Sequence, residues 1–379
     1  MTQGALLSSS NFFKNRAINR RSQLAFWKGN WRTGLLRFVE RFLLGANISD
    51  RLSADLTQHL QLPEIANQVI SHRVISDGMV LDPITIEPIN LESADVTLTA
   101  TVSSMYEIVL KNASSDVITG LVRLNYGFII ESSLFHWQQL LYRGGVGNSY
   151  YELGSPGERL DGSWAIMPVS EYFYHTLIEE LPRLLRLRKN GHFDGVIVHS
   201  TTRPWALELL REAEFPVLVV QDHKLLIEEL RITTSPRSIS SAEVDLLREA
   251  FSVSSLKDEI SLFISRGNLA RGDLELEEEI FTMLKEFGFK KINPSELSIR
   301  RQIEVFSSAK YIVGLHGGAL SNIVWARPGT IILEIFNHPY RNYCFARLAY
   351  EANLRYSCIE MTPDKNACLN ALLTFIDQN

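Results

Sequence analysis

Short apolar runs and helical patterns alternate through the second half of the chain, and this alternation constrains the fold more than any other feature. Between residues 195 and 232 the order is "GVIVHS", "PWALELLREAE", "FPVLVVQ" and "KLLIEELRI", which begins as strand, helix and strand. A second series runs from "EISLFISRG" to "YRNYCFARLAYEANL", residues 259–354. Strands that alternate with helices of this length predict parallel βαβ units, and hence an α/β fold.

Three regions are predicted from these patterns. Residues 1–60 are basic and helical in pattern, residues 61–235 form a first α/β domain, and residues 236–379 form a second. The Ser-, Thr- and Pro-rich stretch 233–243 predicts a linker, in which Ser240 or Ser241 caps the next helix. The predicted architecture is two doubly wound domains, and ligands of such folds bind beyond the carboxyl ends of the strands.

Composition and charge narrow the classes of function. A net charge of −5 does not favour a nucleic-acid partner, and the three cysteines, all near the C-terminus, give no disulfide framework or metal-ligand spacing. We find no signal peptide and no apolar run long enough to span a membrane, so we expect a cytoplasmic protein. The basic segment 11–46 packs on the main body or lies on an anionic membrane surface, and both interpretations stay open. No oligomeric state is predicted.

The segment "YIVGLHGGALSNIVWA", residues 311–326, places a histidine and two glycines between an apolar run and a helical pattern. The unpaired N–H groups in the first turn of a helix can bind a phosphate, and glycines let a ligand approach the backbone. His316, Gly317 and Gly318 are therefore candidates for an anion-binding turn. A simple βα turn with a satisfied histidine is the alternative that these residues alone leave open.

Three charged residues accompany the turn. Arg266 and Arg271 follow a predicted strand in "FISRGNLARGD", and arginine forks pair well with phosphate oxygens. Solvated surface arginines are the other interpretation. Glu334 lies inside the apolar strand "TIILEIF", where a buried carboxylate needs a partner. A ribose diol and a neighbouring helix are equally acceptable partners.

Several familiar motifs are absent from the sequence. We find no Walker loop, no G-x-G-x-x-G, no G-x-S-x-G, no D-x-D and no H-E-x-x-H. We therefore expect no cofactor and no divalent metal. A bound diphosphate would have to be neutralised by Arg266 and the helix that follows His316.

Taken together, three segments resemble a known family. They are "EYFYHTLIEELPRLLRL" (171–187), "SRGNLAR" (265–271) and "SELSIRRQIEVFSSAKYIVGLHGGALSNIVWARPGTIILEIF" (295–336). The combination resembles the family-61 glycosyltransferases over about residues 96–358. The resemblance implies a GT-B fold, in which two Rossmann-like domains face across a cleft. It also implies a nucleotide-sugar donor, usually UDP-linked, a glycan or glycolipid acceptor, and inverting transfer without a metal.

The resemblance also implies which residues hold the donor. Contacts with the diphosphate would come from the loop after residue 264 and from the turn 316–322, namely Arg266, Gly267, His316, Gly317, Gly318, Ala319, Leu320 and Asn322. Arg271 and Glu334 would support the donor site, and residues 295–298, which include Ser298, would lie near the nucleotide base of the donor. We expect such an enzyme to assemble a surface polysaccharide at the inner face of a bacterial membrane.

Inverting transfer needs a base for the acceptor hydroxyl. His175 and Glu179 are four residues apart on the predicted helix 170–191, and hence on one face. We favour His175 as the base because the pKa of histidine suits neutral pH, with Glu179 as its orienting partner. The reverse assignment stays open, as does a structural role for both in which Glu179 pairs with Arg183.

Two rival functions remain at this point. One is a non-catalytic nucleotide-sugar or glycan-binding protein with a degenerate transferase fold. The other is a different α/β enzyme with a nucleotide ligand, such as a methyltransferase or an epimerase, although the missing glycine-rich first turn disfavours a dinucleotide.

Overall fold

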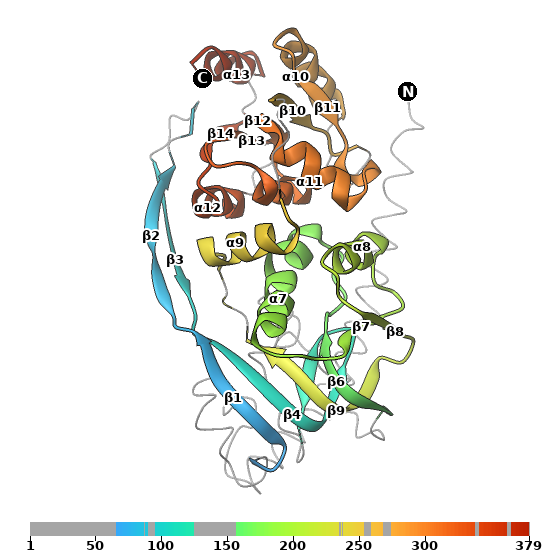
Figure 1. Ribbon diagram of the computed structural model, residues 1–379. Coiled ribbons are helices and arrows are strands. Elements are labelled where there is room, and N and C mark those ends of the chain that lie inside the picture. Colours follow the sequence, from blue (N-terminus) through green and yellow to red (C-terminus); the bar gives the residue numbers. More distant parts are fainter. Residues whose placement is uncertain are drawn as a thin grey trace, which may run out of the picture.

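The computed structural model describes residues 66–86, 88–89, 95–124, 157–234, 236, 238–253, 259–267, 274–337, 341–361 and 365–378. These residues form two lobes, each built around one sheet, and a two-stranded ribbon that runs along one side of both (Figure 1). The predicted α/β class is confirmed. The basic region predicted for residues 1–60, including the segment 11–46, lies outside the described residues.

The first lobe contains a seven-stranded mixed sheet. Its strands are, in spatial order, β1 (Val69–Ser76), β4 (Met105–Asp116), β9 (Lys224–Thr233), β6 (Glu158–Ile166), β7 (Gly195–His199) and β8 (Val217–Val220), with β5 (Leu121–Arg123) also beside β4. The β9–β6–β7–β8 part is parallel, whereas β4 is antiparallel to β1, β5 and β9. The prediction of a doubly wound first domain is therefore wrong for the β1–β4 side. There the chain leaves β1, reverses through the ribbon and returns as β4.

The second lobe contains a five-stranded parallel sheet. The strand order is β11 (Lys290–Ile292), β10 (Ile260–Ile264), β12 (Ala309–Leu315), β13 (Ile331–Phe336) and β14 (Arg355–Glu360). One face is covered by α10 (Leu274–Glu286) and α13 (Lys365–Gln378), and the other by α11 (Ile299–Ser307), η6 (Gly318–Trp325) and α12 (Cys344–Glu351). The order changes direction between β10 and β12, the position at which doubly wound sheets bind ligands.

A shared apolar core joins the two lobes. Helices α7 (Leu181–Asn190), α8 (Pro204–Glu212) and α9 (Ser241–Ala250) lie between the sheets (Figure 1), and one cluster of buried side chains extends from them to α11, η6 and α12. The rings of Phe251 and Trp325 lie 4.9 Å apart within this cluster. The predicted cap is confirmed, since Ser240 and Glu243 form a capping box at the start of α9.

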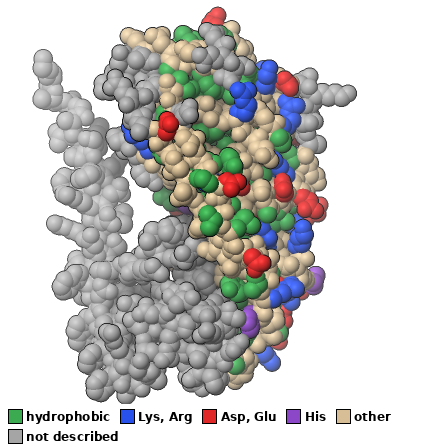
Figure 2. All heavy atoms as spheres, turned by 90° about the vertical axis from the view of Figure 1, so that its left-hand side faces the viewer, with side chains coloured by type: hydrophobic (Ala, Val, Ile, Leu, Met, Phe, Trp, Pro, Cys, Tyr) green, Lys and Arg blue, Asp and Glu red, His purple; other side chains and the backbone are tan. Residues whose placement is uncertain are grey.

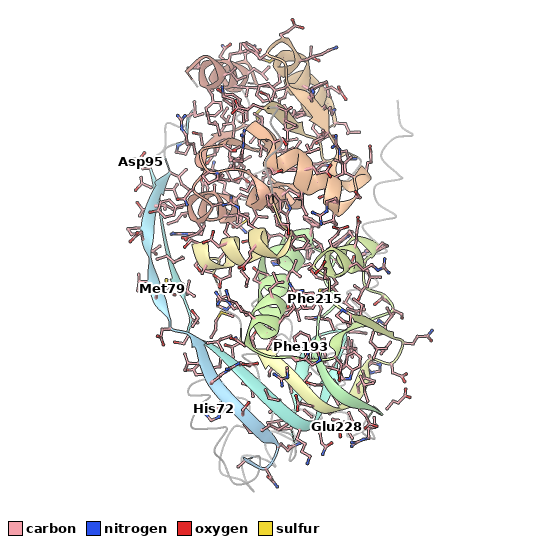
Figure 3. All side chains as sticks on the ribbon, in the orientation of Figure 1. His72, Met79, Asp95, Phe193, Phe215 and Glu228 are labelled. Carbon is pink, nitrogen blue, oxygen red and sulfur yellow. The ribbon has the colours of Figure 1, made fainter. Side chains whose placement is uncertain are left out.

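Strands β2 (Met79–Ile86) and β3 (Val96–Val102) form an antiparallel ribbon that leaves the first lobe and lies along the second (Figure 1). In Figure 3, Met79 marks the ribbon between the lobes and Asp95 marks its far end beside the second lobe. The inner face of the ribbon packs its apolar side chains on β13, β14 and α12, in a cluster of Ile84, Ile86, Phe336, Ala346 and Cys358.

Arg347 on α12 fastens the ribbon to the second lobe. This side chain is buried, and its Nη1 donates to the Asp82 carbonyl at 2.9 Å while its Nη2 donates to the Leu98 carbonyl at 3.1 Å. The same guanidinium also pairs with Glu351 at 3.2 Å. One buried cation therefore holds both strands of the ribbon.

Strand β1 and the ribbon carry several exposed hydrophobic side chains. Figure 2 views the molecule from the side of these strands and shows hydrophobic side chains interspersed with acidic and basic ones. The exposed hydrophobic residues there are Ile70 (52%), Val74 (52%), Met79 (51%) and Val80 (79%). Among the residues that the structure describes, no helix is both long and apolar enough to cross a bilayer.

Candidate active site

A cavity of ≈ 1380 Å³ lies between the lobes. Residues 171–175 and the start of α8 line it from the first lobe, and residues 98–100 of the ribbon also border it. From the second lobe it is lined by the segments that follow β10 and β12 and by the start of α12. The switch point of the parallel sheet therefore opens into this cavity, which makes it the candidate ligand site.

The predicted anion-binding turn follows β12 and faces the cavity. The His316 N–H donates to the Ile335 carbonyl at 2.8 Å, and Arg266 Nη1 donates to the His316 carbonyl at 2.8 Å. Because Arg266 follows the neighbouring strand β10, the two strands at the switch point bring the guanidinium and the turn together. The predicted donor-site residues that line the cavity are Arg266, His316, Gly317, Gly318, Ala319 and Asn322.

The helix after this turn is wound more tightly than predicted. Residues Gly318–Trp325 form a 3₁₀ helix, and the Leu320 N–H donates to the Gly317 carbonyl at 2.9 Å. Asn322, which is 1% exposed, holds the first turn from inside by donating to the Ala319 carbonyl at 3.1 Å. A short 3₁₀ helix aligns fewer peptide dipoles than the α-helix expected here, so the charge of Arg266 would carry more of any anion binding.

Gly317 allows Arg266 to pack on the turn. A Cβ at Gly317 would lie 2.7 Å from Arg266 Nε and 2.8 Å from Cζ, inside van der Waals contact. We expect Gly317→Ala to displace the guanidinium at little cost in stability, because a long side chain can move. If the turn holds a diphosphate, as the sequence predicts, the binding of a nucleoside diphosphate, measured by calorimetry, should weaken roughly tenfold. In a protein that already carries Arg266→Ala, Gly317→Ala should not lower the affinity for the nucleoside diphosphate any further. A second tenfold loss of affinity in the double variant would contradict this account.

Glu334 is fully buried at the end of β13, behind the turn. Its Oε1 lies 2.5 Å from His316 Nδ1, and the Tyr356 hydroxyl donates to Oε2 at 2.5 Å. Burial raises the pKa of Glu334, and the hydrogen bonds from His316 and Tyr356 lower it. Because Glu334 does not line the cavity, a ribose bound there would not reach this carboxylate. Glu334 instead holds the ring of His316, which does line the cavity. Tyr356 was not among the predicted site residues.

Tyr356→Phe should shift the pH dependence of ligand binding. The hydrogen bond from Tyr356 lowers the pKa of Glu334, so its loss raises that pKa further. On acidification the carboxylate then becomes protonated at a higher pH, and its charge-assisted bond with His316 weakens. If the cavity binds a nucleoside diphosphate, the acid side of its binding-versus-pH curve should therefore move to higher pH. Calorimetry across the acid range checks this, with exposed Tyr350→Phe as the control; coincident limbs for Tyr356→Phe and wild type would rule it out.

The other predicted donor-site residues do not line the cavity or are not described. Gly267 has a left-handed backbone (φ 56°) in the loop after β10. Ser298 caps α11, where its hydroxyl accepts from the N–H of Arg301 at 3.2 Å. Leu320 is fully buried in the core, and Arg271 lies outside the described residues. The three described residues therefore shape the backbone around the site.

A buried amide network beneath the turn was missed in the sequence. Gln302 on α11 donates to the Leu297 carbonyl at 3.1 Å and accepts from Asn322 at 2.9 Å. The Trp325 indole N–H completes the chain by donating to Asn322 at 3.2 Å. Gln302 and Leu297 both line the cavity, so the network ties α11 to the turn. The available signal was a glutamine within the apolar stripe of a helix.

The predicted His175–Glu179 pair forms in the first lobe. Residues His175–Glu180 form a π-helical segment that leads into α7, and such segments are frequent at functional sites. His175 Nδ1 lies 3.0 Å from Glu179 Oε2, and both side chains are a little over a quarter exposed and line the cavity. The alternative pairing of Glu179 with Arg183 is not the one observed, because Arg183 pairs at 3.0 Å with buried Glu180.

Aromatic rings connect this pair to the turn in the other lobe. The ring of Tyr174 lies 5.5 Å from His175 and 5.6 Å from Phe345 on α12, and Phe345 lies 5.5 Å from His316. Cys344 also lines the cavity, but burial raises the pKa of its thiol well above the ordinary value, which makes it a poor nucleophile. The two histidines therefore face one cavity from opposite lobes.

A doubly wound sheet with an arginine and a glycine turn at its switch point is typical of α/β proteins that bind nucleotides. Within the described residues, no group of three or more His, Cys, Asp and Glu side chains is arranged to hold a metal ion. Residues 173–333, which include His175, Arg266 and His316, match the family model described as Glycosyltransferase 61. The match supports the resemblance found in the sequence, and this segment is similar to that family.

Two curated plant proteins are also similar to the chain. Beta-1,2-xylosyltransferase RCN11 from Oryza sativa subsp. japonica is 30% identical over 67 residues, which cover 18% of this chain and 13% of that protein. Beta-1,2-xylosyltransferase from Arabidopsis thaliana is 26% identical over 164 residues, which cover 40% and 30%. The matches thus span less than a third of each relative.

A solved structure, a flavo di-iron protein from Thermotoga maritima, superposes with a TM-score of 0.26 and 11% identity over 79% of this chain and 100% of that chain. A score this low carries no argument about the fold.

Proposed function

We propose that the protein is an inverting glycosyltransferase that moves a sugar from a UDP-linked donor to a hydroxyl acceptor. One observation carries the proposal: Arg266 and the His316 turn line one wall of the cavity, and the His175–Glu179 pair lines the other. The two lobes would then act as the two halves of a GT-B arrangement, with the donor in the second lobe and the acceptor reached from the first. The family match supports this reading.

In the proposed reaction His175 is the base. When the Nδ1–H group donates a hydrogen bond to Glu179, the lone pair of the ring is on Nε2, which takes the proton of the acceptor hydroxyl. The acceptor oxygen forms its bond to the anomeric carbon while the bond from that carbon to the diphosphate oxygen breaks. The electron pair of the broken bond leaves with UDP. Attack and departure on opposite faces invert the configuration, and the Glu179 carboxylate stabilises the imidazolium that forms.

The leaving diphosphate needs positive charge, which Arg266 would supply together with the N–H groups of the turn. In its protonated form, His316 would donate a further hydrogen bond from Nε2 while Nδ1 donates to Glu334. We propose that no metal takes part, so that excess EDTA leaves transfer unchanged. We also propose, on the family resemblance alone, that the product is part of a surface polysaccharide.

A donor screen tests the proposed function. The full chain is incubated with UDP, GDP and CMP and with their common sugar conjugates, and its melting temperature and the release of free nucleotide are measured. UDP at one hundred times its dissociation constant should stabilise the protein by about 2.7 kcal/mol, and the matching UDP-sugar should be turned over. Absence of stabilisation by any nucleotide would refute the proposal. If a nucleotide sugar binds but is neither turned over nor slowly hydrolysed, the protein is instead a nucleotide-sugar-binding protein.

A further inference from the structure

Two tyrosines flank the His175 ring edge-on, and their surroundings differ. Tyr174, at 5.5 Å and 88°, is partly buried, and its ring contacts Phe345, which lines the cavity from the second lobe. Tyr172, at 5.7 Å and 83°, is 59% exposed and lines the cavity. His175 therefore lies between a partly buried tyrosine that packs toward the second lobe and an exposed tyrosine, Tyr172, and both line the cavity.

The backbone of Tyr172 is held in place although its ring is exposed. Its N–H donates to the hydroxyl of buried Ser170 at 3.1 Å, and that hydroxyl donates to the Tyr172 carbonyl at 3.2 Å. The same carbonyl accepts from the Thr176 N–H at 3.3 Å as the helix begins. A tyrosine on a fixed backbone offers a large contact area and loses little conformational entropy when a ligand binds.

The surroundings of Tyr172 are amphipathic. Trp205 at the start of α8 lines the same side of the cavity, where the ring of Phe173 meets it edge-on at 5.3 Å. The carboxylate of Glu171, paired with Arg203, lies beside them and also lines the cavity. Aromatic faces next to a carboxylate suit a ring that has an apolar C–H face and a rim of hydroxyl groups. A pyranose has both.

We propose that Tyr172 is the acceptor platform, on which a pyranose ring stacks so that one of its hydroxyls faces His175. The inference rests on the proposed function and makes it more specific: the acceptor is a carbohydrate. A peptide serine or threonine would also supply a hydroxyl, but it has no ring to cover the exposed face of Tyr172.

Saturation-transfer NMR on the full chain with saturating UDP tests the platform. The probes are the methyl pyranosides of xylose, glucose, galactose and mannose, with N-acetylserinamide as the peptide probe. In the wild-type protein, saturation should be transferred to the ring C–H protons of at least one pyranoside. Tyr172→Phe should keep this transfer signal because the phenyl ring is retained. Tyr172→Ala should lose about tenfold in affinity for the same pyranoside. Phe287→Ala, which removes an exposed aromatic ring outside the cavity, is the matched control.

The binding of UDP separates the two ways of failing. If wild type and Tyr172→Ala bind UDP and saturate the pyranoside equally, the platform is overturned while the donor site stands. If wild type binds UDP and saturates only N-acetylserinamide, the acceptor is a peptide hydroxyl, and the platform is likewise overturned. Failure of wild type to bind UDP refutes the proposed function itself. A tenfold loss confined to Tyr172→Ala, with UDP binding intact, supports the proposal.

Discussion

His175→Ala should lower kcat for sugar transfer by about 10²- to 10⁴-fold and leave the affinity for UDP unchanged. The reason is that the imidazole lies across the cavity from Arg266 and the His316 turn, so its removal takes away the proposed base and leaves the donor wall intact. Steady-state rates and UDP calorimetry on the same preparation measure the two quantities. Glu179→Gln should give a smaller loss, because the amide oxygen still accepts from Nδ1 but stabilises the imidazolium less.

Exposed His192 supplies the control, since it does not line the cavity and His192→Ala should have wild-type rates. Undiminished transfer in both His175→Ala and Glu179→Ala would remove this pair from the mechanism. A full loss in Glu179→Ala beside a mild loss in His175→Ala would reverse their roles, with the carboxylate as the base.

Arg266→Ala should weaken UDP binding by about two orders of magnitude. The Arg266 guanidinium packs against the His316 turn at the switch point of the sheet. Without it, the diphosphate would lose its charge-assisted hydrogen bonds. Arg266→Lys should fall between alanine and wild type, because lysine keeps the charge and loses the planar fork. The salt dependence of UDP binding should also become shallower in the alanine variant.

Arg301→Ala is the control for general loss of charge, because Arg301 is exposed on α11 and pairs with Glu304 at 2.9 Å. Arg266 also donates to the His316 carbonyl, so the melting temperature without nucleotide shows whether the turn itself has loosened. UDP affinity equal to wild type in Arg266→Ala would place the donor elsewhere.

Periodicity is enough to predict the second lobe, because its elements are regular and its central strands are largely buried on both faces. All six residues of β13 are buried, as such a run requires. The position of Arg266 and of the His316 turn follows from the same pattern, since both come directly after strands that end at the same edge. The resemblance supplied the roles, and the fold explains why these residues meet.

Partners across the sheet are not encoded in periodicity. The sequence shows that Glu334 needs a partner, but the identity of Tyr356 depends on how β14 aligns with β13, and no local pattern fixes that register. The π-helical segment is also invisible, because the residues around His175 favour a helix whether or not one turn is widened.

The first lobe was predicted less well for a related reason. Strands β1 and β2 were not predicted, and β2 contains Pro83, which removes a donor and confines such a strand to an edge. Strand β3 alternates regularly between apolar and polar residues, whereas the apolar positions of β2 are irregularly spaced. Because β1 and β2 were not predicted, the reversal of the chain that makes half of the first sheet antiparallel was not predicted either.

The ribbon also bears on how the molecule folds. Arg347 and Asp82, which it brings together, are separated by 265 positions, so the second lobe is completed by a segment synthesised long before it. A fragment that begins near residue 236 would present Phe336, Ala346 and Cys358 to water and would tend to aggregate. Bringing the two ends of so long a loop together slows folding, and the contact becomes favourable only when both ends are structured. The two lobes should therefore unfold in one cooperative transition, although each has a sheet of its own.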